Sequence, residues 1–158
     1  MDSNNEHGHK FDYSIITDNI ILGSDFCNHR VCKLHSSEFK KLGVSSEISL
    51  RAELKEVPAD ELCTYTWLPV PDKMAPNQNQ LAIGTSIIDG AVSSGQKIYV
   101  HCTHGHGRSP TLVVAYFIRF QGKSLEEAEH IVKEKRPEIH IEPPQREALV
   151  EFAKRWSK

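Results

Sequence analysis

The segment that most constrains the fold is a short apolar run that leads through a turn containing two glycines into an apolar helix. Residues 97–101 (KIYVH) predict a buried strand, and residues 110–121 predict a helix that is apolar almost all round and therefore central. In the turn, Gly105 and Gly107 accept backbone dihedral angles that other residues avoid. A strand that leads directly into a tight turn and a central helix is typical of α/β folds.

The rest of the sequence also alternates strand-like with helix-like segments. Further strands are predicted at residues 14–16, 20–23, 44–50 and 65–70, and further helices at residues 36–43, at 145–156, at 81–92 and after the capping box that begins at Ser124. We therefore expect one α/β domain, residues 11–158, with a central, mainly parallel sheet flanked by helices. A polar tail, residues 1–10, precedes it; His7 and His9 are expected to lie in this frayed terminus and not to bind metal.

The composition excludes several classes of protein. With 158 residues, 39% hydrophobic and 25% charged, the chain is long and apolar enough for one globular core. The net charge of −2 gives no general attraction to nucleic acid or to acidic membranes. No apolar run approaches the ~20 residues of a membrane span, and the stretch MDSNNEHGHK lacks the apolar region of a secretory signal. We expect a cytoplasmic monomer with no membrane span and no nucleic-acid partner.

The chain has four cysteines, at positions 27, 32, 63 and 102. A chain of this length does not depend on a disulfide framework, and the Cys27/Cys32 pair lacks a nearby second pair at metal-ligand spacing. We expect Cys27, Cys32 and Cys63 to be ordinary thiols. A reversible disulfide between one of them and Cys102 finds no support in the spacing.

The turn after residues 97–101 has the composition of an anion-binding loop. In such a turn successive N–H groups converge on one point, to which the following helix presents its positive N-terminal end. The planar guanidinium of Arg108 can hold two oxygens of one phosphate. The residues expected to bind a phosphate group above Cys102 are Thr103, His104, Gly105, His106, Gly107 and Arg108.

The same surroundings make Cys102 a candidate nucleophile. A thiol near a helix N-terminus and an arginine has its pKa lowered from ~8.5 to between ~3.5 and ~7.5, so it is a thiolate at neutral pH. A thiolate in line with a phosphate ester displaces the ester oxygen and forms a phosphocysteine, which water then hydrolyses. Ser109 can donate a hydrogen bond to the sulfur. Asp72 is the candidate acid, because it follows the strand at 65–70 and is expected at the sheet edge where the Cys102 loop emerges, although aspartate after proline is often only a turn former.

The segment Cys102-x5-Arg108, preceded by His101 and followed by Ser109, resembles the signature of the cysteine-dependent protein tyrosine phosphatases. Asp72 lies 30 residues before Cys102, and this short spacing resembles the dual-specificity branch. The likeness extends over residues 11–156. The other similar segments are 13–24, 68–72 and 136–139, which resemble the opening strands, the general-acid loop and the approach to the last helix.

The resemblance implies a role for each of these residues. It implies that residues 11–158 are a dual-specificity phosphatase-like catalytic domain. In it Cys102 is the nucleophile, Arg108 clamps the transition state, and Asp72 acts as acid and then as base. Gln145 lies where some relatives carry a water-orienting glutamine, although the match is loose. The resemblance implies no metal or organic cofactor, and a phosphoprotein substrate carrying phosphotyrosine and also phosphoserine or phosphothreonine.

Three other functions stay open at this point. His104 and His106 are either simply solvated or, when protonated, add positive charge for a phosphoinositide or another highly anionic substrate. Residues 101–105 also resemble the loop of RNA 5′-triphosphatases, but the net charge of −2 and the presence of Asp72 argue against a polynucleotide 5′-triphosphatase. A non-catalytic phospho-binding module is disfavoured because the three catalytic candidates are all present.

Overall fold

The computed structural model describes residues 11–27 and 29–157; the sequence-predicted tail, residues 1–10, lies outside the described residues. Strands and helices alternate along the described chain, as the sequence predicts. In chain order they are β1 (Tyr13–Ile15), β2 (Ile20–Gly23), α1 (Lys33–Leu42), β3 (Val44–Arg51), β4 (Thr64–Val70), α2 (Gln78–Ser93), β5 (Lys97–His101), α3 (Arg108–Phe120), α4 (Leu125–Lys135) and α5 (Pro143–Trp156).

The strands form one sheet in the order β1-β2-β5-β3-β4. β1 and β2 are an antiparallel hairpin, whereas β2 with β5, β5 with β3, and β3 with β4 pair in parallel. The prediction of a mainly parallel sheet is therefore confirmed. The carboxyl ends of parallel strands meet at one edge of a sheet, so the loops after β3, β4 and β5 emerge together.

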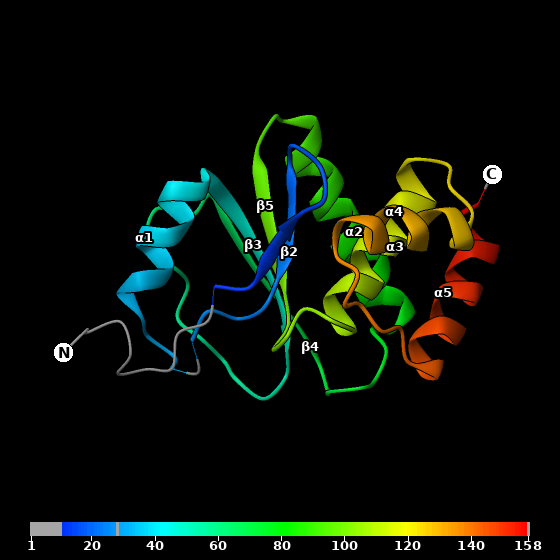
Figure 1. Cartoon of the computed structure of the whole chain (residues 1–158), viewed down its shortest axis with the longest axis horizontal. Helices are drawn as coiled ribbons and strands as arrows, with labels where there is room; N and C mark the ends of the chain where they lie inside the picture. The colour runs from blue at the N-terminus through cyan, green and yellow to red at the C-terminus, as the bar shows by residue number, and fades with distance from the viewer. Residues whose placement is uncertain (1–10, 28, 158) are drawn as a thin grey trace.

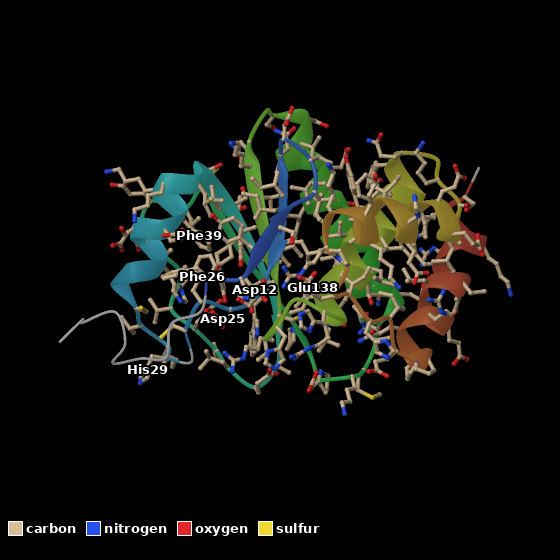
Figure 2. The ribbon with its side chains drawn as sticks, in the orientation of Figure 1. Asp12, Asp25, Phe26, His29, Phe39 and Glu138 are labelled. Carbon is tan, nitrogen blue, oxygen red and sulfur yellow. The ribbon has the colours of Figure 1, made fainter. Side chains whose placement is uncertain are left out.

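Helices cover both faces of this sheet (Figure 1). α1 lies alone on one face, and α2 to α5 form a layer on the other. Phe26 and Phe39 lie between the sheet and α1 (Figure 2). They pack with Tyr99 of β5, with ring centroids 5.0 to 5.6 Å apart. The larger core lies on the opposite face, where α3 is buried along most of its length. This confirms α3 as the central helix and the α/β class.

Several element boundaries differ from the sequence prediction by one to three residues. α1 begins at Lys33 instead of residue 36, because its N-cap is Cys32, in an extended conformation, and not one of the serines that follow. β4 ends at Val70, as the sequence predicts, and it contains Pro69. β4 is an edge strand, and proline, which lacks an N–H group, is tolerated there because one side of the strand has no partner strand. No helix in the described part of the chain is long and apolar enough to span a membrane.

Candidate active site

The loop between β5 and α3 turns on Gly105. Its φ angle is +73°, in the left-handed region that favours glycine. Its backbone also lies directly against Gly23 at the end of β2, and a Cβ atom on Gly105 would come within 2.5 Å of the Gly23 carbonyl. Conformation and space therefore both require glycine at this position.

Hydrogen bonds from outside the loop fix the carbonyl groups of four consecutive residues, 103–106. The N–H of Asp25 donates to the Thr103 carbonyl (3.1 Å), and the N–H of His140 donates to the His106 carbonyl (2.6 Å). Between them, the guanidinium of Arg136 donates to the carbonyls of His104 (2.9 Å) and Gly105 (2.8 Å). In a curled loop whose carbonyls are held outward, the amide N–H groups turn inward and form a nest for an anion. The outward carbonyls suit the phosphate-binding loop that the sequence predicts at residues 103–108, and phosphate binding there stays a prediction.

Arg136 was not identified from the sequence as a site residue. Its side chain is completely buried, and besides the two loop carbonyls it donates from Nη1 to Asp12 and Ser14, both at 3.1 Å. A fully buried arginine is rare unless every donor is paired. Nothing in the local sequence distinguishes Arg136, because its partners lie 31 to 124 residues away in the chain.

Cys102 lies at the base of the loop and is buried. Its Sγ atom accepts a hydrogen bond from the N–H of Gly105 at 3.3 Å and lies 3.2 Å from Oγ of Ser109. Burial on its own raises the pKa of the Cys102 thiol. The hydrogen bonds from Ser109 and Gly105 and the charge of Arg108 outweigh it, so the pKa lies below the usual range of a thiol.

Arg108, the first residue of α3, is held in one orientation by three groups. Nη1 donates to the carbonyl oxygen of Val70 and to Oε2 of Glu53, both at 2.8 Å. Nη2 donates to Oε1 of Glu53 at 2.9 Å and to Oγ1 of Thr103 at 3.0 Å. The plane of the guanidinium is therefore set before any phosphate arrives.

Glu53, in the loop after β3, is a second residue that the sequence reasoning missed. Its carboxylate also accepts a hydrogen bond from Oγ1 of Thr103. Partial burial acts to raise the pKa of Glu53, but the hydrogen bonds from Arg108 and Thr103 hold it well below its usual range. Glu53 sits in a polar stretch with other acidic residues, so no local signal marks it.

One pocket of about 270 Å³ brings most of the sequence-predicted site residues together. Asp72 Oδ1 lies 3.7 Å from Nη2 of Arg108, with the carboxyl group exposed to solvent. Gln145 is buried and held by two hydrogen bonds, from the N–H of Glu142 (2.9 Å) and to the carbonyl of Met74 (3.1 Å). The lining residues are Asp72, Lys73, Cys102, His104, His106, Gly107, Arg108, His140, Glu142 and Gln145. Of these, Lys73, His140 and Glu142 were not expected from the sequence.

His104 and His106 stand side by side at this pocket, with stacked rings whose centroids are 6.0 Å apart. Burial and the neighbouring Arg136 hold the pKa of His106 below its usual range. His106 is therefore a neutral hydrogen-bonding side chain at neutral pH. It becomes a source of positive charge only in acid.

His101 supports the loop from inside the sheet. Its Nε2 atom lies 3.2 Å from Glu56 and 3.3 Å from Glu47, and all three side chains are buried. Burial opposes protonation, but the two glutamates outweigh it and raise the pKa of His101 well above its usual range. Nδ1 lies 3.2 Å from the carbonyl oxygen of Cys102, so this buried cation sits directly before the nucleophile.

The arrangement of Cys102, Arg108 and Asp72 is that of the cysteine-dependent phosphatases of the protein tyrosine phosphatase class. The family model for the catalytic domain of dual specificity phosphatases matches residues 28–155. The chain belongs to this family, as its sequence resemblance implied.

The chain resembles proteins named for two kinds of substrate. It is 31% identical over 121 residues to the phosphatidylglycerophosphate phosphatase PTPMT2 of Arabidopsis thaliana, a match that covers 73% of this chain and 53% of that protein. It is 30% identical over 131 residues to the tyrosine-protein phosphatase vhp-1 of Caenorhabditis elegans, covering 80% of this chain and 19% of that protein. The chain thus spans about half, or less, of the length of these relatives.

The fold also matches solved structures closely. A crystal structure of PTPMT1 in complex with PI(5)P superposes with a TM-score of 0.79 at 26% identity, covering 90% of this chain and 95% of that one. The antiparallel hairpin, the parallel strands and the helical layer therefore belong to a fold that this family shares.

Proposed function

We propose that this chain hydrolyses phosphate monoesters through a phosphocysteine intermediate. The observation that carries the proposal is that the Cys102 thiol, the Arg108 guanidinium, the Asp72 carboxyl group and the Gln145 amide line one pocket. These groups supply what the reaction requires: a nucleophile, a clamp for phosphate oxygens, a proton donor and a hydrogen-bonding group for water.

In the first step the Cys102 thiolate attacks phosphorus, the S–P bond forms, and the P–O bond to the leaving group breaks. Arg108 and the loop N–H groups hold the non-bridging oxygens, which carry the charge of the transition state. Asp72 gives its proton to the departing oxygen, so that an alcohol or phenol leaves in place of an alkoxide or phenoxide. Its exposed position beside Arg108 suits a group that meets the substrate from solvent.

In the second step water attacks the phosphocysteine, and the S–P bond breaks to release phosphate. Asp72, now a carboxylate, takes the proton of that water. Gln145, whose amide is held by Glu142 and Met74, orients the water. The leaving thiolate is stabilised by Ser109 and the Gly105 N–H, the same groups that lower the pKa of Cys102 in the resting protein.

As substrate we propose phosphoproteins, with phosphotyrosine and also phosphoserine or phosphothreonine as the ester. The family to which the chain belongs and the likeness to vhp-1 support this substrate class. The cytoplasmic location, the monomeric state and the extent of the domain stay predictions from the sequence.

A second candidate, a phospholipid headgroup, is favoured by the lining of the pocket. Lys73, His104, His106 and His140 surround the phosphate site, and no phenylalanine, tyrosine or tryptophan is among its described lining residues. Such a lining, which also contains the carboxylates of Asp72 and Glu142, suits a polar phosphorylated headgroup. The relative named phosphatidylglycerophosphate phosphatase and the PI(5)P complex of a similar fold support the same substrate.

Hydrolysis of an aryl phosphate tests the reaction itself. The wild-type protein is expected to release phosphate, to be inhibited by vanadate and to trap radiolabelled phosphate on Cys102 after an acid quench. The Cys102→Ser variant should lose turnover, whereas Cys63→Ser, at an exposed cysteine, should keep it. Equal turnover in wild-type and Cys102→Ser protein would refute the mechanism.

A substrate panel decides between the two substrates. We expect the highest kcat/KM on a phosphotyrosine peptide, with measurable activity on the matched phosphoserine peptide. A higher value on phosphatidylglycerophosphate or PI(5)P in micelles, lowered by Lys73→Ala and by the His104→Ala/His106→Ala pair, would establish the lipid instead. A kcat/KM for release of γ-phosphate from triphosphorylated RNA that exceeds the values for the peptides and the lipids would refute both substrate proposals.

A further inference from the structure

Four metal-binding side chains gather between β2 and α1, away from the catalytic pocket. One donor atom each of Cys27, Cys32 and His35 lies within 4.8 Å of the others. Nδ1 of His29 lies 3.6 Å from Sγ of Cys27. Cys27 and His35 are buried, Cys32 is half-buried, and His29 is exposed, so the cluster can be reached from solvent. Figure 2 shows His29 at this side of the molecule, below α1.

We propose that Cys27, His29, Cys32 and His35 bind a structural zinc ion. Zinc takes four ligands at tetrahedral corners, about 2.3 Å from sulfur and about 2.0–2.1 Å from nitrogen, which places a sulfur and a nitrogen ligand roughly 3.6 Å apart. The distance from Cys27 to His29 already has this value, and the donors of Cys27, Cys32 and His35 lie within 4.8 Å of one another, so the site closes when Cys32 and His35 move inward and His29 turns toward them.

The order of the ligands along the chain also fits zinc. Four residues separate Cys27 from Cys32 and five separate His29 from His35, within the spacings usual for paired cysteine and paired histidine ligands. The two pairs are interleaved. The spacing argument from the cysteines alone missed the site, because the second pair of ligands consists of histidines.

The chemistry of the donors selects the ion. Thiolate and imidazole together favour zinc over magnesium or calcium, which take oxygen ligands. Two thiolates also balance the double charge of the ion. A complete set of four protein ligands leaves no open position for substrate, so the site is structural and not catalytic.

Groups around the donors are placed as outer partners of metal ligands. The backbone N–H of His29 donates to Sγ of Cys27 at 3.4 Å, which offsets negative charge on a thiolate ligand. Nε2 of His35 lies 3.8 Å from Asp25, so one ring nitrogen can bind the ion while Nε2 stays beside a carboxylate.

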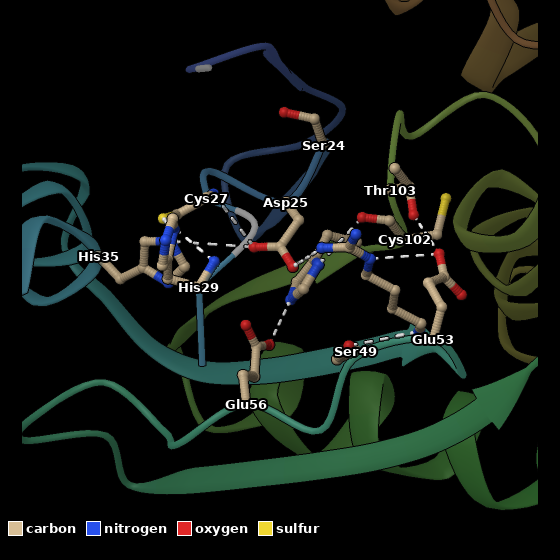
Figure 3. Close-up of polar contacts among 12 residues, drawn as sticks. Ser24, Asp25, Cys27, His29, His35, Ser49, Glu53, Glu56, Cys102 and Thr103 are labelled. Carbon is tan, nitrogen blue, oxygen red and sulfur yellow. Dashed lines mark hydrogen bonds and ion pairs between the residues drawn. The ribbon is translucent and has the colours of Figure 1, made fainter. Parts of the chain in front are cut away.

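Asp25 lies between this cluster and the catalytic loop, with Glu53 and Thr103 on its other side (Figure 3). Oδ2 of Asp25 accepts from Nη1 of Arg51 at 3.0 Å, and Nε of Arg51 lies 3.2 Å from Glu53, which in turn holds Arg108. The N–H of Asp25 also holds the Thr103 carbonyl. A zinc ion that fixes His35 would therefore hold in place a polar chain that ends at the arginine of the loop.

Metal content of the full chain, purified under reducing conditions without chelator, tests the proposal. We expect one zinc per chain in the wild-type protein. The content should be unchanged in Cys102→Ser, which removes the catalytic thiol, in Cys63→Ser, and in His7→Ala/His9→Ala, which removes histidines near the N-terminus. It should be lost in Cys27→Ser/Cys32→Ser. His29→Ala, at an exposed position, should lower zinc affinity at least tenfold in a chelator competition while the circular dichroism spectrum stays that of the wild type.

Cobalt substitution of the wild-type chain supplies a test that needs no variant. Bound Co²⁺ should show the intense visible bands of a tetrahedral site and a thiolate-to-metal charge-transfer band. Octahedral bands, absence of metal, loss of zinc in Cys102→Ser, or a Cys27–Cys32 disulfide in the reduced preparation would each overturn the proposal. None of these results depends on phosphatase turnover, so the zinc site and the proposed function are tested independently.

Discussion

Both carboxylate oxygens of Glu53 accept hydrogen bonds from the guanidinium of Arg108, at 2.8 Å from Nη1 and 2.9 Å from Nη2. The pair is bidentate and charge-assisted, the geometry in which arginine is most strongly oriented. Glu53, Val70 and Thr103 take four of the five N–H bonds of Arg108, so Nε–H is left for phosphate, and a second phosphate oxygen must displace one of these contacts. Glu53 is thus a positioning residue for the arginine that clamps the phosphate.

Replacing Glu53 by glutamine tests this role. The amide keeps the shape of the side chain but accepts only one of the two hydrogen bonds and carries no charge. Because a hydrogen bond to a charged group contributes about 1.5–3 kcal/mol, we expect kcat/KM on an aryl phosphate to fall roughly 10- to 100-fold. Glu134→Gln, at an exposed position on α4, is the matched control. Wild-type kcat/KM in Glu53→Gln would show that Arg108 needs no such support.

Ser109→Ala should raise the pKa of the Cys102 thiol, because Ser109 contributes the leading hydrogen bond that stabilises the thiolate. The thiolate is the reactive form, so the rate of alkylation by iodoacetamide should reach half its maximum at a higher pH than in the wild type. The acid limb of the kcat/KM profile should move the same way, with more activity lost at pH 5–6 than at pH 8. An unchanged midpoint would assign the lowered pKa to the backbone N–H of Ser109, the charge of Arg108 and the N–H of Gly105 instead.

Asp72→Asn should lower kcat most where the leaving group needs a proton. General acid catalysis contributes about 10²- to 10⁴-fold, so an alkyl phosphate should lose activity in that range. An aryl phosphate with a strongly acidic phenol should lose much less, and KM should change little for either substrate. Wild-type kcat on the alkyl phosphate would remove Asp72 from the mechanism.

Arg136→Met should destabilise the protein strongly. The substitution keeps the volume of a fully buried side chain but leaves the His104 and Gly105 carbonyls and Asp12 without their donor. Breaking such a buried network costs about 3–5 kcal/mol, which thermal or urea unfolding would measure. The exposed Lys133→Met should stay within about 0.5 kcal/mol of the wild type. A similarly small effect in Arg136→Met would mean that the loop holds its shape without this residue.

Gly105→Ala should abolish turnover, whatever its effect on stability. A methyl group there is opposed by the positive φ angle and by the Gly23 backbone at 2.5 Å, and a backbone atom cannot rotate away as a side chain can. The loop must open, which withdraws the Gly105 N–H from Cys102. Gly95→Ala has a matching φ angle of +73° but open space around it, and it should keep activity. Activity in Gly105→Ala close to that of Gly95→Ala would contradict this view of the loop.

Most of the fold could be predicted from the sequence because its elements carry strong local signals. The strand at 97–101 and the capping box at Ser124 were each identified correctly. The start of α1 was missed because the N-cap is Cys32, a residue type that gives no capping signal and makes no side-chain capping bond.

In the candidate site too, the residues with a local sequence signal were predicted and the residues without one were missed. The loop residues, Arg108 and Ser109 are contiguous in the sequence, so their pattern could be recognised, and Asp72 followed from its place after a strand. Glu53 and Arg136 reach the loop only through the tertiary fold. An acidic residue in a polar loop and an arginine before a proline carry no local mark of what they will contact.

Arg136 also sets the order in which the catalytic loop can be completed during protein synthesis. It follows Gly105 by 31 residues and Asp12 by 124, and it contacts both. While the ribosome is still adding the residues between them, Cys102 has already been synthesised, but Arg136, which holds the loop around it, has not. Until residue 136 has been added, the loop around Cys102 therefore lacks the guanidinium that holds its His104 and Gly105 carbonyls.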